Sequence, residues 1–184
     1  MGVDFERTVK DFLTFYKVQS PKITFSFDNT IYNSTIFIKQ DFITLSKKYL
    51  SIPVIIFGNE VKPVKGLRNI VTKFSNFKSE NIEDHAVLDD WLEYIETHSV
   101  DFDALSVLRE VNDYLEDKVY FVGYKYGPID VLMYYLLYNI YSTFTYQDKE
   151  NYTYVSRWFN TMQHLDNFKL GKPIIPFTRC CLYT

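Results

Sequence analysis

The sequence predicts an α+β first part that leads into an all-helical second part. Alternating apolar residues with strand character, such as Ile23, Phe25 and Phe27, lie in the first part of the chain. From about residue 81 onward, apolar residues recur every three to four positions, which is the spacing of amphipathic helices. The chain has 184 residues, of which 47% are hydrophobic and 18% aromatic, so it can bury a full core.

The first part begins with a predicted helix over residues 5–16, whose apolar residues share one face: Phe5, Val9, Phe12, Leu13 and Tyr16. Gln19-Ser20-Pro21 ends this helix, and a half-buried strand is expected over residues 23–27. Residues 35–50 fit either a strand or a short helix, and both alternatives remain open.

A second strand is predicted over residues 52–57, and it contains a proline. Pro53 requires an edge position, a bulge or a cis peptide bond, because proline cannot donate to a strand ladder. Gly58-Asn59 predicts a turn into residues 60–62, and the apolar spacing of residues 67–74 predicts a helix.

The second part carries three further helical stripes. They consist of Val87, Leu88, Trp91, Leu92 and Ile95; of Leu105, Leu108, Val111 and Leu115; and of Tyr152, Val155, Trp158, Phe159 and Met162. Trp91 and Trp158 are expected to be core anchors, and Thr145 to Asp148 has the pattern of a capping box. Residues 166–184, with Pro173 and Pro176, are expected to form an irregular tail.

A helix-start signal stands at Gly127-Pro128-Ile129-Asp130. Gly127 fits the N-cap position, and Pro128 fits the first helical position, where no N–H partner is needed. Asp130 at the third position can accept from the cap backbone and complement the positive helix end. We therefore interpret Gly127 and Asp130 as folding residues of a core helix.

Composition and charge exclude several classes of protein. The formal charge of −3 and the scattered basic residues argue against direct nucleic-acid binding. The longest apolar run, residues 131–138, is too short to cross a membrane, and charged residues interrupt the first apolar pattern, so no signal segment is expected. Cys180 and Cys181 are adjacent and favour a reduced cytoplasmic or nuclear setting.

No metal, cofactor or catalytic cluster is expected. His85, His98 and His164 share no ligand spacing with one another or with the cysteines. The carboxylates of Glu93, Glu96, Asp101 and Asp103 are interpreted as the solvated side of a helix pair.

Several segments together resemble one family. They are Ile52-Pro53-Val54, Gly66-Leu67, Trp91-Leu92-Glu93-Tyr94, residues 114–120, Gly123-Tyr124, residues 130–135, residues 155–159, Gln163-His164 and Leu182-Tyr183-Thr184. This set resembles the glutathione S-transferase-like family, and within it the auxiliary proteins of the multi-tRNA-synthetase complex. The resemblance is dense over residues 86–164. It implies a reduced thioredoxin-like part over residues 1–78 and a transferase-type helical domain over residues 79–184.

The resemblance also implies a non-catalytic scaffold that supports translation. Members of this family hold methionyl-tRNA synthetase on one face and glutamyl-prolyl-tRNA synthetase on another, beside other auxiliary proteins, and some enter the nucleus. The first face would use the second strand and the helix that follows it, through Ile52, Val54, Leu67 and Ile70. The second face would use the last long helix, through Ser156, Arg157 and Gln163, with Arg157 at the family's interface arginine. By periodicity alone, Arg157 fits a solvated charge equally well.

The alternative hypothesis is a divergent glutathione transferase. Such an enzyme needs a Tyr, Ser or Cys that activates the glutathione thiol near the N-terminus, but no Cys precedes position 180 and Tyr16 lies on an apolar stripe. Lys65-Gly66 stand where the family places an acidic or amide residue followed by Ser, so only weak anion binding by backbone N–H groups is expected there. A third hypothesis, a role in guanine-nucleotide exchange, ranks last because the sequence shows no separate exchange domain.

Overall fold

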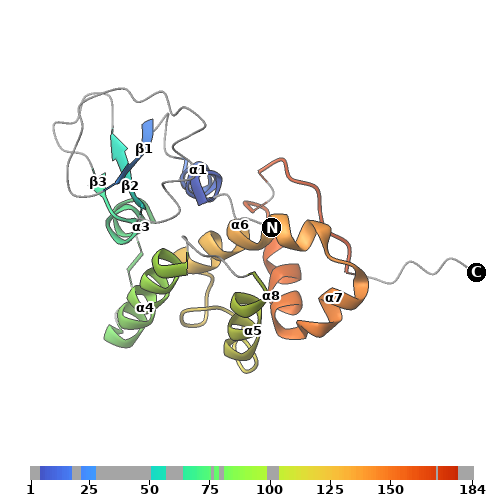
Figure 1. Cartoon of the computed structure of the whole chain (residues 1–184). Helices are drawn as coiled ribbons and strands as arrows, with labels where there is room; N and C mark the ends of the chain where they lie inside the picture. Colours follow the sequence, from blue (N-terminus) through green and yellow to red (C-terminus); the bar gives the residue numbers. More distant parts are fainter. Residues whose placement is uncertain are drawn as a thin grey trace, which may run out of the picture. The chain divides into compact units, whose positions relative to one another are not determined.

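The computed structural model describes residues 5–17, 22–27, 51–56, 64–75, 77–78, 81–98, 104–168 and 170–177 (Figure 1). The chain divides into a helical unit, residues 1–15 with 103–184, and a sheet unit, residues 16–102. This division differs from the boundary expected after residue 78. Within the helical unit, the helix over residues 5–15 packs on the helix over residues 128–143. Within the sheet unit, the helix over residues 82–98 packs on the helix over residues 67–75.

The sheet unit contains a three-stranded antiparallel sheet in the order β1-β2-β3. Its strands are β1 (Lys22–Phe27), β2 (Ser51–Ile56) and β3 (Val64–Lys65). Helix α3 (Leu67–Ser75) follows β3 and packs on α4 (Ile82–His98). Both predicted strands and both predicted helices of this region are confirmed, whereas the open assignment of residues 35–50 and the turn at 58–62 lie outside the described residues.

Pro53 is tolerated in β2 because it is paired with a neighbouring strand on one side only. β1 pairs with β2 along its whole length and places Phe25 opposite Pro53. β3 pairs only with Val54 and Ile55, so Pro53 has a strand neighbour on one side. Among the described residues no peptide bond is cis. Of the three alternatives, the local edge position is the one observed.

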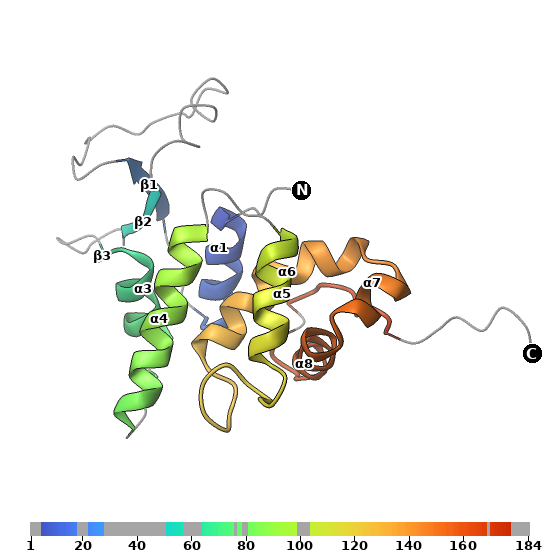
Figure 2. The same cartoon turned by 60° about the horizontal axis from the view of Figure 1, so that its bottom comes forward.

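The helical unit consists of α1 (Phe5–Phe15), α5 (Ala104–Tyr114), α6 (Pro128–Thr143), α7 (Tyr146–Asn151) and α8 (Thr153–Gln163). α6 is its centre, because every residue from Pro128 to Tyr141 except Asn139 is buried. α6 contacts α1 and α8, and α5 lies beside α8 (Figure 2). The prediction that a core helix begins at Pro128 is confirmed.

Aromatic rings fill the space between α6 and α8. Tyr141 stacks on Phe159 with ring centroids 4.7 Å apart, and Phe121 meets Trp158 edge to face at 5.2 Å. Such pairs contribute beyond the area that they bury. Trp158 is 1% exposed and confirms its prediction as a core anchor, whereas Trp91 is only half-buried.

The second capping box and the last predicted stripe lie on two successive helices, α7 and α8. Thr145 and Asp148 form the predicted capping box: the Asp148 N–H donates to Thr145 Oγ1 at 3.3 Å, and the Thr145 N–H donates to Asp148 at 3.0 Å. α7 then ends after six residues, and Tyr152, with φ −118° and ψ 60°, leaves the helical conformation before α8 begins. The break turns the buried face of α8 toward α6.

Asp130 is more than a helix cap. Its carboxylate accepts the predicted bond from the Gly127 N–H at 2.9 Å. It also accepts from the Phe121 N–H at 3.2 Å and from Trp158 Nε1 at 2.8 Å. Complete burial raises the pKa of Asp130 to about 6. This one side chain therefore joins the start of α6 to the preceding loop and to α8.

Candidate protein interface

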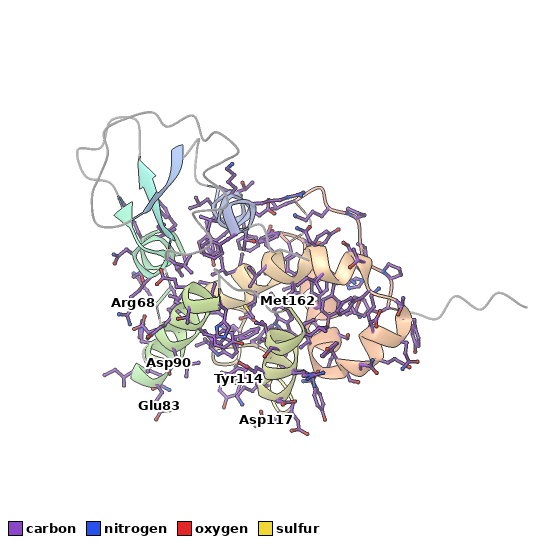
Figure 3. The ribbon with its side chains drawn as sticks, in the orientation of Figure 1. Arg68, Glu83, Asp90, Tyr114, Asp117 and Met162 are labelled. Atoms are coloured by element: carbon purple, nitrogen blue, oxygen red, sulfur yellow. The ribbon has the colours of Figure 1, made fainter. Side chains whose placement is uncertain are left out.

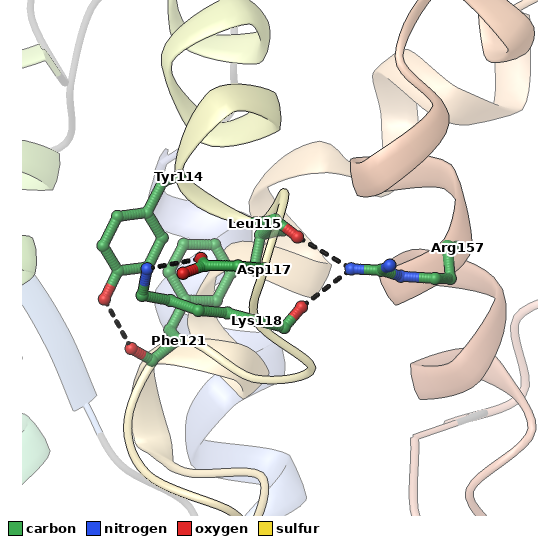
Figure 4. Close-up of polar contacts among 6 residues, drawn as sticks. All are labelled: Tyr114, Leu115, Asp117, Lys118, Phe121 and Arg157. Atoms are coloured by element: carbon green, nitrogen blue, oxygen red, sulfur yellow. Dashed lines mark hydrogen bonds and ion pairs between the residues drawn. The ribbon is translucent and has the colours of Figure 1, made fainter.

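Helices α5 and α8 cap each other's ends. Asn112 of α5 accepts from the N–H groups of Tyr154 and Val155, at 3.1 and 3.4 Å, in the first turn of α8. In return, Arg157 of α8 donates from Nη2 to the carbonyl oxygens of Leu115 and Lys118, at 2.7 and 2.8 Å (Figure 4). Helix ends leave backbone groups without intrahelical partners, and each helix here supplies what the other lacks. The pair is thereby fixed as one platform.

The loop after α5 is held around the Arg157 side chain. The Tyr114 hydroxyl donates to the Phe121 carbonyl at 2.8 Å, and Lys118 pairs with Asp117 at 2.8 Å (Figure 4). The bond from Lys118 lowers the pKa of Asp117. These contacts give the loop a defined shape beside an exposed guanidinium.

Arg157 is exposed although its Nη2 atom is engaged. Its guanidinium lies 5.6 Å from the centroid of the Tyr154 ring, and the Tyr154 hydroxyl donates to Glu116 at 3.1 Å. That hydrogen bond raises the pKa of the Tyr154 hydroxyl. The structure thus adds a role that periodicity did not predict, in which Arg157 closes the end of α5 while remaining available to a partner.

The exposed face of α8 is a polar row: Thr153, Arg157, Asn160, Thr161 and His164. His164 is placed by a contact of 2.7 Å between its Nδ1 and the Asn160 carbonyl. A rigid polar face with one planar cation suits a partner that offers carboxylate or amide groups.

The interface role predicted for Ser156 and Gln163 is corrected. Ser156 is 9% exposed, and its hydroxyl donates to the Lys149 carbonyl at 2.7 Å. Gln163 is 2% exposed, and its amide bonds the backbone of Ile175 in both directions at 3.0 Å. Both side chains point inward because they lie on the α8 face that packs against α6 and the tail. Of the three predicted residues, only Arg157 lies on the surface.

On the other predicted face, the roles of Leu67 and Ile70 need the same correction. Leu67 and Ile70 are fully buried, because the apolar stripe of α3 faces the inside of the structure. Ile52 and Val54 lie in β2, opposite Ser26 and Thr24 of β1. The exposed row of α3 is polar and consists of Arg68, Asn69, Thr72 and Lys73.

A hollow lies between α3 and α4, and this exposed row lines one side of it. Arg68 crosses it to form an ion pair with Asp89, whose Oδ1 accepts from Arg68 Nε at 2.6 Å. Phe77 and His85, which also line the hollow, meet edge to face with ring centroids 5.5 Å apart. On α4, Glu83 in the first turn and Asp90 are exposed to solvent (Figure 3).

The start of α3 already has an anionic partner. Glu96 accepts from the Leu67 N–H at 2.7 Å, and the Gly66 carbonyl accepts from the Ile70 N–H at 3.1 Å. Gly66 has a φ of +84°, a conformation that favours glycine. One backbone N–H of the helix start at which weak anion binding was predicted is thus engaged by a carboxylate of the chain itself.

The capping roles of Asn112 and Glu96 were not predicted from the sequence, because no local pattern indicates them. Each acts on the end of another helix, and their partners lie 42 and 29 residues away in the chain. Glu96 was grouped with solvated carboxylates, and Tyr16 was expected in the core but lies half-buried in the turn after α1.

Neither a metal site nor a membrane-spanning helix is present in the part of the chain that the structure describes. Within the ranges given above, no group of three or more His, Cys, Asp and Glu side chains is placed to hold a metal ion. None of the helices described has both the length and the apolar character needed to cross a membrane.

Part of the chain is similar to a known family of domains. Residues 84–166, which run from the first turn of α4 past the end of α8, match the Arc1p_N_like family model, described as nuclear-export cofactor Arc1p.

Three curated proteins are similar to the chain, and all are eukaryotic translation elongation factor 1 epsilon-1. The human protein is 39% identical over 106 residues, which cover 55% of this chain and 61% of that protein. The Cricetulus griseus and Mus musculus proteins are 38% and 37% identical over 105 residues, with 55% of this chain and 60% of each protein covered. The chain therefore spans about 60% of the length of these relatives. The predicted resemblance is confirmed as a similarity to elongation factor 1 epsilon-1.

Proposed function

We propose that the chain is a non-catalytic auxiliary scaffold of translation that docks aminoacyl-tRNA synthetases through transferase-like domains. The observation that carries this proposal is the α5–α8 platform, in which reciprocal capping holds Arg157 at the surface. A guanidinium fixed before binding loses little conformational freedom when a partner carboxylate engages it. The similarity to elongation factor 1 epsilon-1 supports the assignment to translation.

The partners that we propose are methionyl-tRNA synthetase and glutamyl-prolyl-tRNA synthetase, beside other auxiliary proteins of the complex. We assign glutamyl-prolyl-tRNA synthetase to the exposed row of α8 around Arg157. We assign methionyl-tRNA synthetase to the exposed row of α3, which includes Lys73, in place of the buried Leu67 and Ile70. The sheet unit would be a reduced thioredoxin-like part, an interpretation that its antiparallel strands and the helix after β3 support. The setting would be the cytoplasm, with entry into the nucleus.

A crossed pull-down tests the two faces. The tagged chain and its Arg157→Ala and Lys73→Glu variants are mixed with each purified synthetase domain, and the bound fraction is measured. We expect Arg157→Ala to reduce binding of the glutamyl-prolyl enzyme alone and Lys73→Glu to reduce binding of the methionyl enzyme alone. Each variant is the control for the other, since both remove one exposed basic side chain.

A structural control is needed because Arg157 also closes the end of α5. Asn112→Ala breaks the other α5–α8 cap and leaves the guanidinium in place. If Asn112→Ala weakens binding as much as Arg157→Ala does, the platform's stability matters and the direct contact is refuted. Equal capture of both synthetases by all three variants would refute the assignment of faces.

The competing enzyme hypothesis has one specific requirement that the structure bears on. A transferase must hold the glutamyl carboxylate of glutathione at a helix start, and the Leu67 N–H is engaged by Glu96. We therefore propose that the chain does not conjugate glutathione. Retention on glutathione resin, or turnover of a chlorinated nitroaromatic substrate above the uncatalysed rate, would contradict this.

A further inference from the structure

A strap formed by residues 172–177 lies outside the family match and is held by side chains of four helices. Tyr138 of α6 donates to the Pro173 carbonyl at 2.6 Å. Lys149 of α7 donates to the Pro176 carbonyl at 2.9 Å, and Gln163 of α8 bonds the Ile175 backbone twice. At its start, Lys172 pairs with Asp11 of α1 at 2.8 Å. The backbone of the strap is therefore fixed along its length.

The sequence of the strap favours the polyproline II conformation. Lys172-Pro173-Ile174-Ile175-Pro176 contains two prolines, whose rings fix φ near −65°. Each proline also disfavours the helical conformation in the residue before it, here Lys172 and Ile175. The strap contains no helix or strand, as expected for a helix type without internal hydrogen bonds.

Exposure along the strap follows the three-residue repeat of that conformation. Lys172 is half-buried and Ile175 is 5% exposed, so this ridge faces the helices. Pro173 and Pro176, three residues apart, are both exposed, and Ile174 beside them is 50% exposed. The carbonyl oxygens of Pro173, Ile175 and Pro176 bond to the helices, and the proline rings are left at the surface.

We propose that the strap is a preformed Pro-x-x-Pro ligand, in which Pro173 and Pro176 bind a partner domain with an aromatic-lined polyproline groove. Domains of the SH3, WW and EVH1 classes recognise this conformation through such grooves. A free proline-rich segment must be ordered when it binds, whereas the helices of this chain hold the strap beforehand. The surface would therefore add a second kind of partner, chemically distinct from a transferase-like domain.

The test uses the full chain labelled with ¹⁵N and a panel of purified SH3, WW and EVH1 domains. We expect at least one domain to shift the backbone amide signals of Lys172, Ile174, Ile175 and Phe177, the residues of the strap that carry an N–H. The affinity of the Pro173→Ala/Pro176→Ala double variant for that domain should be lower by at least roughly tenfold. The matched control is Pro21→Ala/Pro63→Ala, which removes two prolines elsewhere and should bind unchanged.

A further variant tests whether the helices prepare the ligand. Ile175→Ala keeps both prolines but removes the buried anchor, and its affinity should fall several-fold because the segment must then be ordered on binding. The spectrum of each variant before titration shows whether the helical core is intact. The proposal is overturned if no domain of the panel binds, or if the double proline variant binds as tightly as its control. Unchanged affinity of Ile175→Ala would overturn the role of the helices.

Discussion

Replacing Asp130 by Ala removes the one acceptor shared by three elements. The change leaves the N–H groups of Gly127 and Phe121 and the indole Nε1–H of Trp158 without their carboxylate partner. All three donors belong to buried residues, and Trp158 is 1% exposed. The helix start, the preceding loop and α8 are all affected by this single substitution.

The decrease in the free energy of unfolding caused by Asp130→Ala follows from the number of buried donors that lose their acceptor. A buried polar group that loses its partner costs about 1–3 kcal/mol, and three such groups set the upper limit. Burying the charged carboxylate is unfavourable at neutral pH, which is why the pKa of Asp130 is raised. Removing the carboxylate removes this unfavourable contribution and so offsets part of the destabilisation. We expect a net decrease of about 3–4 kcal/mol in the free energy of unfolding at pH 7. For a chain of this length the midpoint of thermal unfolding should fall by roughly 6–16 °C.

The assay is urea unfolding followed by far-ultraviolet circular dichroism, which does not depend on tryptophan fluorescence. Trp158→Phe removes one donor and should cost about 1 kcal/mol by itself. Once Asp130 is absent, the same change should cost less, because the indole N–H no longer has a partner to lose. Additive effects in the double variant, or a cost below about 1 kcal/mol for Asp130→Ala, would refute the shared-acceptor reasoning.

Three further predictions concern other features. The raised pKa of Asp130 means that its contribution is fully present below about pH 3.8 and is lost as pH rises through about 6. The destabilisation by Asp130→Ala should therefore grow by about 1 kcal/mol between pH 7 and pH 5 in urea unfolding, and a constant difference would contradict this. Arg157→Ala should lower the free energy of unfolding by about 1–2 kcal/mol because two carbonyls lose a charged donor, and amide hydrogen exchange should rise at the end of α5. Glu96→Ala should cost about 1 kcal/mol and be partly compensated by added sulfate at the freed Leu67 N–H; an unchanged sulfate response would show that Glu96 does not occupy an anion site.

Local signals made much of the fold predictable. The box at Gly127-Pro128-Ile129-Asp130 and the one at Thr145–Asp148 each involve residues three apart, so the geometry of one turn is enough to read them. The same holds for the apolar stripes of α1, α3 and α5, whose period is intrinsic to a helix. The end of α7 at Asn151 was missed, because no Gly or Pro interrupts the chain between α7 and α8.

The candidate interface was less predictable, for a physical reason. Ser156, Arg157 and Gln163 all belong to the last long helix, and a family resemblance ranks them together, but their exposure depends on how α8 is turned. Packing against α6 and the strap buries two of them, and the end of α5 engages the third. The family resemblance likewise placed Leu67 and Ile70 on a surface. Their own apolar stripe favours burial, and the structure shows both residues buried.

The amino-acid sequence by itself determined the strands β1 and β2, the helices α1, α3, α4, α5 and α6, the two capping boxes and the resemblance to elongation factor 1 epsilon-1, because these depend on neighbours within a few turns or on a linear match. Only the tertiary structure decided that Asp130 also bonds Trp158, that Asn112 and Arg157 cap each other's helices and that Glu96 takes the start of α3. Those contacts join residues 28 to 43 positions apart. Side chains so distant in the chain meet only when the packing of the helices has fixed their rotation and spacing, which no local pattern specifies.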